Sequence, residues 1–181
     1  MIDEAKSIWA GLEFRKAMLL RNVEPLSEPQ MLWRPGPDRV SIAWQLWHIA
    51  EVEDNWVRLL ITNEPLRFPF GLQVREAKRD DQFPPKQQLI DYLAEVRGIT
   101  EQRLEAANPE DFSREAEDVD YGRQAVRDIW GGVVTSFAWH AGQIALTAKL
   151  LPDSPVKTMT FGYWREWKGD GESGAGEASL T

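Results

Sequence analysis

The sequence contains four long stretches in which apolar residues recur at helical spacing. These stretches cover residues 4–22, 41–61, 84–108 and 124–151. Pro25 follows the first stretch, Ser41 is suited to cap the second, and Pro152 stops the last. No segment shows convincing strand-like alternation. The pattern therefore predicts an all-α fold, a four-helix bundle.

The connectors between the predicted helices are longer than a minimal up-and-down bundle needs. Three prolines and a glycine within residues 29–37 argue against any regular element there. Residues 63–83 form a second irregular connector, and residues 109–122 read as an acidic loop. Connectors of this length predict at least one long crossover connection.

Length and composition predict one soluble domain of modest size. The 181 residues divide into a bundle over residues 1–165 and a flexible Gly/Ser/Glu-rich tail over residues 166–181. A net charge of −8 argues against binding to nucleic acid or to an anionic membrane surface, and no apolar run is long enough to span a bilayer. The chain has no cysteine, and its first residues lack the basic region of a signal peptide. We therefore expect a cytoplasmic protein.

The chain has only two histidines, His48 and His140. On a helical projection His48 lies at the edge of the apolar arc of the second helix, near Trp44 and Asn55. His140 lies within the apolar face of the last helix, as part of a polar column predicted to point inward. That column consists of Ser136, His140, Gln143 and Thr147.

Two interpretations of these histidines stay open on spacing alone. Each can be a core histidine that bonds to a carbonyl or a water, or both can be metal ligands, because imidazole suits zinc, nickel, copper and iron. The absence of an HxxxH or ExxH pair favours core histidines. The neighbouring Gly131 and Gly132 predict either a kink in the last helix or the close approach of another helix.

Two acidic residues near His48 call for separate explanations. Glu53 falls near the middle of the apolar arc, which predicts an ion pair with an arginine or a bond to a helix N-terminus. Glu51 lies about 60° around the helix from His48, so it can reach the same ion, although a residue at that position is more typically solvated.

Two segments resemble the DinB/YfiT-like superfamily over residues 5–152. They are "WRPGPDRVSIAWQLWHIA", followed by Glu53, and "WHAGQI" in the last helix. The resemblance implies a four-helix bundle with a long crossover, a homodimer, and a divalent metal, zinc or nickel, on three histidines. His48 and His140 match two of those ligands, and the third ligand position falls on Ser136.

The serine leaves several functions open. A third ligand can come from Glu51, Asn55, another loop or water; otherwise the metal site is degenerate. The resemblance implies a metal-dependent enzyme that uses a low-molecular-weight thiol, such as a thiol transferase, with Gln143 and Asn55 in supporting contacts around the ligands. The alternative is a non-catalytic bundle, stress-associated or ligand-binding. A third possibility is a homodimerisation module that uses its tryptophans, although the core needs most of these.

Overall fold

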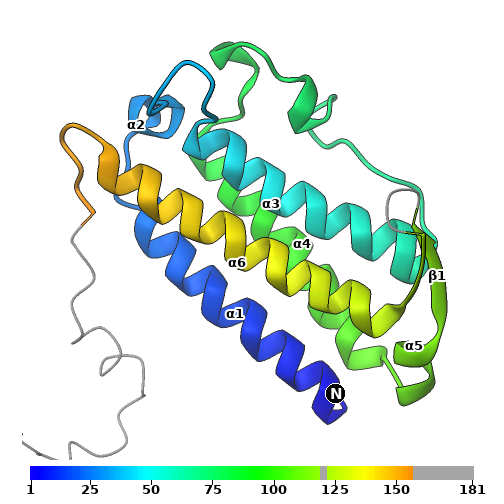
Figure 1. The fold of residues 1–181 in the computed structure, drawn as a ribbon. Helices are drawn as coiled ribbons and strands as arrows, with labels where there is room; N and C mark the ends of the chain where they lie inside the picture. The colour runs from blue at the N-terminus through cyan, green and yellow to red at the C-terminus, as the bar shows by residue number, and fades with distance from the viewer. Residues whose placement is uncertain (119–121, 157–181) are drawn as a thin grey trace, which may run out of the picture.

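Four long helices pack side by side in the computed structural model, which describes residues 1–118 and 122–156 (Figure 1). α6 packs against both α1 and α3, and α4 also contacts α3 and α1. The predicted four-helix bundle is therefore confirmed. The four helices are α1 (Asp3–Val23), α3 (Ile42–Trp56), α4 (Lys86–Ala106) and α6 (Val126–Leu150).

The connection between α3 and α4 crosses over the bundle, as the length of the connectors predicted. Figure 1 shows residues 63–85 running back from the end of α3 to the opposite end of the bundle, where α4 begins. There the Lys86 ammonium donates to the carbonyl oxygen of Glu24, just after α1, at 2.9 Å. α3 and α4 therefore run parallel to each other, and α1 and α6 run the opposite way.

The Pro-rich connector contains a short helix, α2 (Glu28–Leu32), so the expectation of no regular element there is wrong. Pro29 sits in the first helical turn, where its missing N–H removes no intrahelical hydrogen bond. Ser27 and Gln30 form a capping box at the same end. The second connector also contains two short 3-10 helices, η2 (Val74–Glu76) and η3 (Asp80–Gln82).

The expected acidic loop is also partly ordered. It contains α5 (Pro109–Ser113) and an antiparallel pair of strands, β1 (Glu115–Asp118) and β2 (Gly122–Ala125). Arg123 forms ion pairs with Glu115 at 3.3 Å and with Glu117 at 3.7 Å across the hairpin. Opposite charges on facing strands favour this pairing in a segment without apolar alternation.

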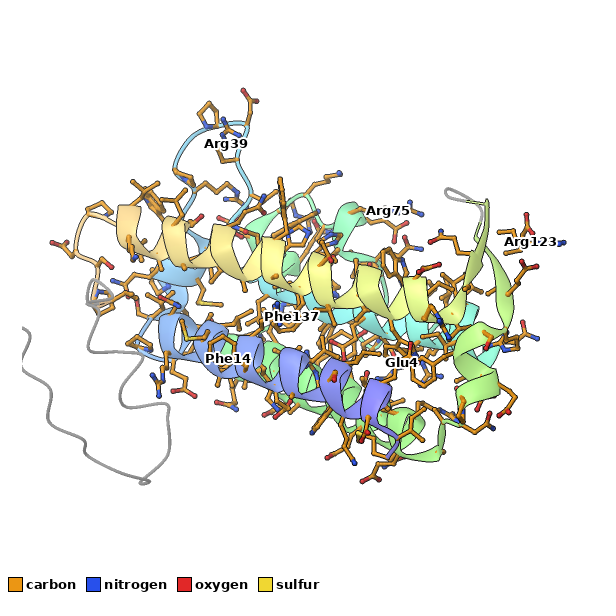
Figure 2. The ribbon with its side chains drawn as sticks, turned by 60° about the horizontal axis from the view of Figure 1, so that its bottom comes forward. Glu4, Phe14, Arg39, Arg75, Arg123 and Phe137 are labelled. Carbon is orange, nitrogen blue, oxygen red and sulfur yellow. The ribbon has the colours of Figure 1, made fainter. Side chains whose placement is uncertain are left out.

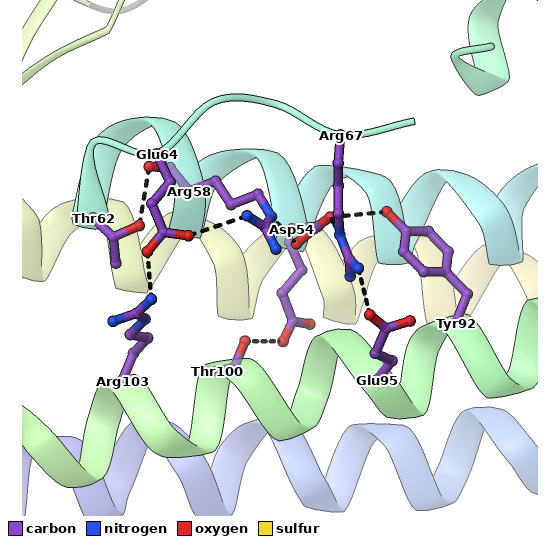
Figure 3. A network of polar contacts seen from close by, with 10 residues as sticks. Asp54, Arg58, Thr62, Glu64, Arg67, Tyr92, Glu95, Thr100 and Arg103 are labelled. Carbon is purple, nitrogen blue, oxygen red and sulfur yellow. Dashed lines mark hydrogen bonds and ion pairs between the residues drawn. The ribbon is translucent and has the colours of Figure 1, made fainter. Parts of the chain in front are cut away.

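Asp54 anchors the crossover connection to α4, although it lies in α3 and its side chain is only 1% exposed. Its carboxylate accepts hydrogen bonds from Arg58 at 2.9 Å, Arg67 at 2.6 Å and the Tyr92 hydroxyl at 3.2 Å (Figure 3). Arg58 lies in η1 (Val57–Thr62), a short π-helix that extends α3. The three donors come from η1, the crossover and α4, so this one carboxylate ties the three segments together.

Glu53 forms the ion pair that its position in an apolar arc predicted. Its carboxylate accepts from Arg97 of α4 at 2.9 Å and from the Thr100 hydroxyl at 2.6 Å. The side chains of Glu53 and Arg97 are both 1% exposed. The guanidinium also lies 4.7 Å from the ring centre of Phe137, which Figure 2 shows between the ribbons of the bundle. The pair therefore joins α3 to α4 inside the core.

Among the described residues, every tryptophan except one is buried in the core or packs against it. Trp47 and Trp130 are fully buried, and the partly buried tryptophans pack against the core. Trp139 is different, because 68% of it is exposed on α6. Trp164 and Trp167 lie outside the described residues, as does the predicted tail over residues 166–181. Within the described part of the chain, no helix combines the length and the apolar character needed to cross a membrane.

One of the two adjacent glycines in α6 permits a close helix contact. A Cβ atom added at Gly132 would lie 2.6 Å from Cζ3 of Trp56 in α3, whereas a Cβ at Gly131 would meet no atom within 4 Å. The expected close approach of another helix is therefore confirmed at Gly132 alone.

We expect Gly132→Ala to destabilise the fold by about 1–3 kcal/mol, because the added methyl group overlaps the Trp56 ring. The matched control is Gly98→Ala in α4, where an added Cβ meets nothing within 4 Å. That variant should gain roughly 0.5–1 kcal/mol from the higher helix propensity of alanine. Urea denaturation measures both changes, and equal stability of the two variants would contradict the assigned contact.

We expect Glu53→Leu to cost about 3–5 kcal/mol, because it removes the nearest counter-charge of the buried Arg97 guanidinium and leaves only the carboxylate of Glu13, 3.8 Å away. Replacing both residues, as Glu53→Leu with Arg97→Met, should cost less than the single change, because no unpaired charge remains. Chemical denaturation of the two variants measures the difference. A double variant that is less stable than Glu53→Leu would show that the ion pair does not account for the loss.

Candidate functional site

The two histidines of the chain meet at the interface between α3 and α6. Their ring centroids lie 4.7 Å apart, and the rings are nearly perpendicular, with an angle of 81° between their planes. Both side chains are half-buried. The packing of α3 against α6 thus brings together two residues that are 92 positions apart in the sequence.

His48 is held from its other side by Trp44, one helical turn earlier in α3. The two rings stack at a centroid distance of 4.7 Å with 24° between their planes. The four-residue spacing places both side chains on one face of α3, so the contact follows from the helix itself. Trp44 therefore restricts the orientation of the His48 ring.

His140 has a polar partner in its own helix. Its Nδ1 lies 3.1 Å from Oε1 of Gln143, three residues later. With the amide oxygen as acceptor, Nδ1 carries the proton and the Nε2 lone pair of His140 stays free. Gln143 thus occupies the position that a supporting contact to a ligand imidazole requires.

The surroundings of the two rings favour neutral imidazoles. Burial lowers the pKa of His48 to about 4, and the neighbouring His140 lowers it in the same direction. Burial also lowers the pKa of His140, and the Gln143 contact opposes this shift. Neutral imidazole is the form that donates a lone pair to a metal ion, so both side chains are ready donors near neutral pH.

Glu51 differs from the expected solvated residue. It is only 6% exposed, and its Oε2 accepts a hydrogen bond from the backbone N–H of Val74 in η2 at 3.0 Å. Burial raises the pKa of this carboxyl, and the Val74 N–H opposes the shift. The expectation failed because the crossover connection, rather than solvent, covers this side of α3. Glu51 therefore helps to fasten the crossover.

Only part of the polar column predicted on α6 points into the bundle. Thr147 is buried and Ser136 is half-buried, but Gln143 is exposed. Ser136 precedes His140 by one helical turn. Asn55 is half-buried in α3, and its Oδ1 is shielded from solvent without a hydrogen-bond partner.

The interface between α3 and α6 brings together two imidazoles rather than three. Among residues 1–118 and 122–156, no group of three or more His, Cys, Asp or Glu side chains is arranged to hold a metal ion. Catalytic zinc sites commonly use three protein ligands and an open position. At this interface the described residues offer two imidazoles, His48 and His140, and Ser136 lies one helical turn before His140 in α6. Further ligands would have to come from weaker donors or from outside the chain.

Comparison with known proteins finds a family whose sequence profile covers most of the chain. The sequence profile of the DinB superfamily matches residues 12–167. Among proteins with curated descriptions, none matches the sequence significantly.

Two solved structures share the fold at low sequence identity. A conserved protein from Enterococcus faecalis superposes with a TM-score of 0.68 at 18% identity, covering 83% of this chain and 98% of that one. YfiT from Bacillus subtilis superposes with a TM-score of 0.66, also at 18% identity, covering 82% of this chain and 89% of that one. YfiT is described as a probable metal-dependent hydrolase with an unusual four-helix bundle topology.

The lowered pKa of His48 predicts a loss of stability on mild acidification. In the unfolded chain this imidazole takes up a proton near pH 6.5, whereas in the folded protein it does so only near pH 4. Between these values the unfolded state binds more protons, so the free energy of unfolding falls as the pH decreases. Allowing for its half-buried position, we expect metal-free protein to lose about 1 kcal/mol more than His48→Gln between pH 7.5 and pH 5.

Urea denaturation of both proteins in the presence of a chelator measures this difference. An identical pH dependence in the two proteins would show that the His48 environment does not disfavour the charged form.

Proposed function

Because this chain belongs to the DinB superfamily and joins two histidines between α3 and α6, we propose that it binds a divalent metal ion, zinc or nickel, at His48 and His140. The contact between the two imidazoles is the observation that carries this proposal. Two imidazoles that bind one tetrahedral ion, with nitrogens about 2.0–2.1 Å from it, have ring centroids roughly 5 Å apart. The observed 4.7 Å agrees with that separation.

The residues around the two rings support the same proposal. The Gln143 amide oxygen accepts a hydrogen bond from Nδ1 of His140, which leaves the Nε2 lone pair free. Trp44 stacks on His48 and limits its rotation. Partial burial keeps both rings neutral without removing them from solvent. Preorganised, neutral imidazoles bind a divalent ion with little loss of conformational freedom.

Ser136 occupies the position where the family resemblance implies a third metal ligand. Ser136 is a much weaker zinc ligand than histidine, so the protein itself supplies two strong donors, and a ligand from solution completes the site. Bound there, zinc or nickel would act as a Lewis acid and lower the pKa of a thiol or a water. The absence of cysteine in the chain means that any thiol would have to arrive with a cosubstrate.

For the reaction we propose transfer to or from a low-molecular-weight thiol, as the family resemblance implies. Hydrolysis, the activity attributed to YfiT, is the alternative chemistry for the same arrangement. The second candidate function is a non-catalytic bundle with a degenerate site. The serine at position 136 favours it, since one strong ligand of the implied set is missing.

Metal content tests the proposal directly. We expect protein made without a histidine tag to bind zinc or nickel with a stoichiometry near one, and His48→Ala and His140→Ala each to abolish binding. We further expect Ser136→His to tighten binding at least tenfold, because it adds an imidazole one helical turn before His140. Thr135→His, which adds the same group one residue earlier on the exposed face, is the control and should leave the affinity unchanged.

Elemental mass spectrometry and calorimetric titration with zinc and nickel give these values. Binding that survives both alanine variants would place the metal elsewhere. No binding by the native protein, together with binding by Ser136→His, would favour the degenerate bundle.

A further inference from the structure

A pocket of about 380 Å³ lies at the end of the bundle that carries α5 and the β1–β2 hairpin (Figure 1). It forms where the ends of η1 and α4 meet α5 and the start of α6. Its volume is within the range of pockets that bind small molecules. Trp130 lines this pocket and precedes His140 by ten residues, so about 15 Å of α6 separates the pocket from the histidine pair.

Much of the pocket wall is apolar. Ile61 and Ala107 are half-buried there, Ala106 is exposed, and the buried Phe112 and Trp130 belong to the same lining. Ala106 ends α4 and Ala107 follows it, and their small side chains leave space that longer ones would fill. An aromatic or aliphatic group can therefore replace water against this wall.

Arg114 brings a positive charge to the pocket. Its backbone carbonyl accepts from the Val126 N–H at 2.8 Å, which ties it to the start of α6. Its guanidinium donates to the carbonyl oxygen of Ile61 at 2.6 Å, and it forms no ion pair with the side chains that the structure describes. A guanidinium has five N–H donors, so the bond to Ile61 leaves others for an anion.

Arg103 supplies a second guanidinium from α4, and a network of ion pairs holds it in place. It pairs with Glu64, which also accepts from Arg58 at 3.1 Å (Figure 3). Arg58 in turn binds the buried Asp54 at 2.9 Å. Because this network orients the Arg103 side chain in the free protein, little conformational freedom is lost when a ligand binds.

The charges around the pocket favour a ligand with a single negative charge. Glu64 offsets Arg103, whereas Arg114 has no such partner among the described side chains. Asp111 also lines the pocket, and its Oδ2 accepts from the Asn108 N–H at 2.9 Å. This carboxylate repels a dianion more than a monoanion. A carboxylate matches the planar fork of a guanidinium in both charge and shape.

We propose that this pocket binds a small aromatic carboxylate. Arg114 and Arg103 hold the carboxylate, and the ring lies against Ile61 and the two alanines that end α4. The net charge of the chain is −8, so most of its surface repels an anion and binding depends on this local pair of arginines. The pocket shares no residue with the histidine pair, and the proposal does not rest on the proposed metal site.

Calorimetric titration of the full chain with 2-naphthoate, a fused-ring aromatic carboxylate, tests the proposal in the presence of a chelator. We expect one binding site. 2-Naphthamide, which has the same rings without the charge, should bind at least about tenfold more weakly. 2-Naphthyl phosphate should bind no more tightly than 2-naphthoate. No detectable binding of 2-naphthoate, or tighter binding of the phosphate, would overturn the proposal.

Arg114→Gln should weaken the binding of 2-naphthoate about tenfold, because it removes the charge that holds the carboxylate. The matched control is Arg39→Gln, at an exposed arginine in the Pro-rich connector at the opposite end of α3 (Figure 2). It should leave the affinity unchanged. Asp111→Asn should tighten binding a few-fold, because it removes a like charge and keeps an oxygen for the Asn108 N–H. Weaker binding by Asp111→Asn would show that the pocket prefers a cation and would overturn the proposal.

A blocking variant tests the location. Ala106→Phe should abolish the binding of 2-naphthoate, because its ring fills the space between the walls. Ala94→Phe, at an exposed alanine earlier in α4, is the matched control and should bind like the native chain. Circular dichroism confirms that each variant folds. A folded Ala106→Phe variant that binds normally would overturn the proposal. Loss of binding in His140→Ala but not in Arg114→Gln would do the same, because it would place the ligand at the histidine pair.

Discussion

Two adjacent buried carboxylates, Glu53 and Asp54, determine how α3 sits in the bundle. Glu53 binds Arg97 and Thr100 of α4, and Asp54 binds donors from η1, the crossover and α4. Glu53 cannot turn toward another neighbour without taking the nearest counter-charge from the buried Arg97, and Asp54 cannot do so without losing three hydrogen bonds. This fixes the rotation of α3 about its axis. His48 lies about 140° around the helix from Glu53, so it is directed toward α6.

The same rotation explains why the two histidines meet and why acidic ligands do not join them. Glu51 and Glu53 are both committed to other partners, one to the backbone of η2 and the other to α4. The interface between α3 and α6 therefore offers two neutral imidazoles and a few weak donors. In other members of the DinB superfamily, the resemblance implies, a third histidine completes this set. Here the chain provides a hydroxyl at that position, so the proposed metal site would depend on an outside ligand.

The sequence predicted the features that arise within one helix or from chain length. These include the four helices, the Ser41 cap, which accepts from the Trp44 N–H at 3.2 Å, and the long crossover. It also predicted an ion pair for Glu53, because an isolated charge in an apolar arc has few alternatives. The sequence did not identify Arg97 as the partner of Glu53, because Arg97 lies 44 positions away on a helix whose direction depends on the crossover.

The failures have a common physical origin in contacts between distant segments. Glu51 looked solvated because helical projection cannot show that η2 covers it. The β1–β2 hairpin has no apolar alternation and is stabilised by charge pairs across the strands. Gly131 and Gly132 look alike in sequence, and only the packing of Trp56 separates their roles. At the candidate site, the proximity of His48 and His140 required knowing that α3 and α6 are neighbours.

The arrangement of the helices has a consequence for how the protein folds during synthesis. α1 makes its most extensive contacts with α6, the last helix within residues 1–156 that the structure describes, and α3 lies parallel to α4 across a long connection. The first helix thus leaves the ribosome with its apolar side uncovered and stays so until nearly the whole chain has emerged. Such distant contacts are slow to form, and the bundle can close only as a whole.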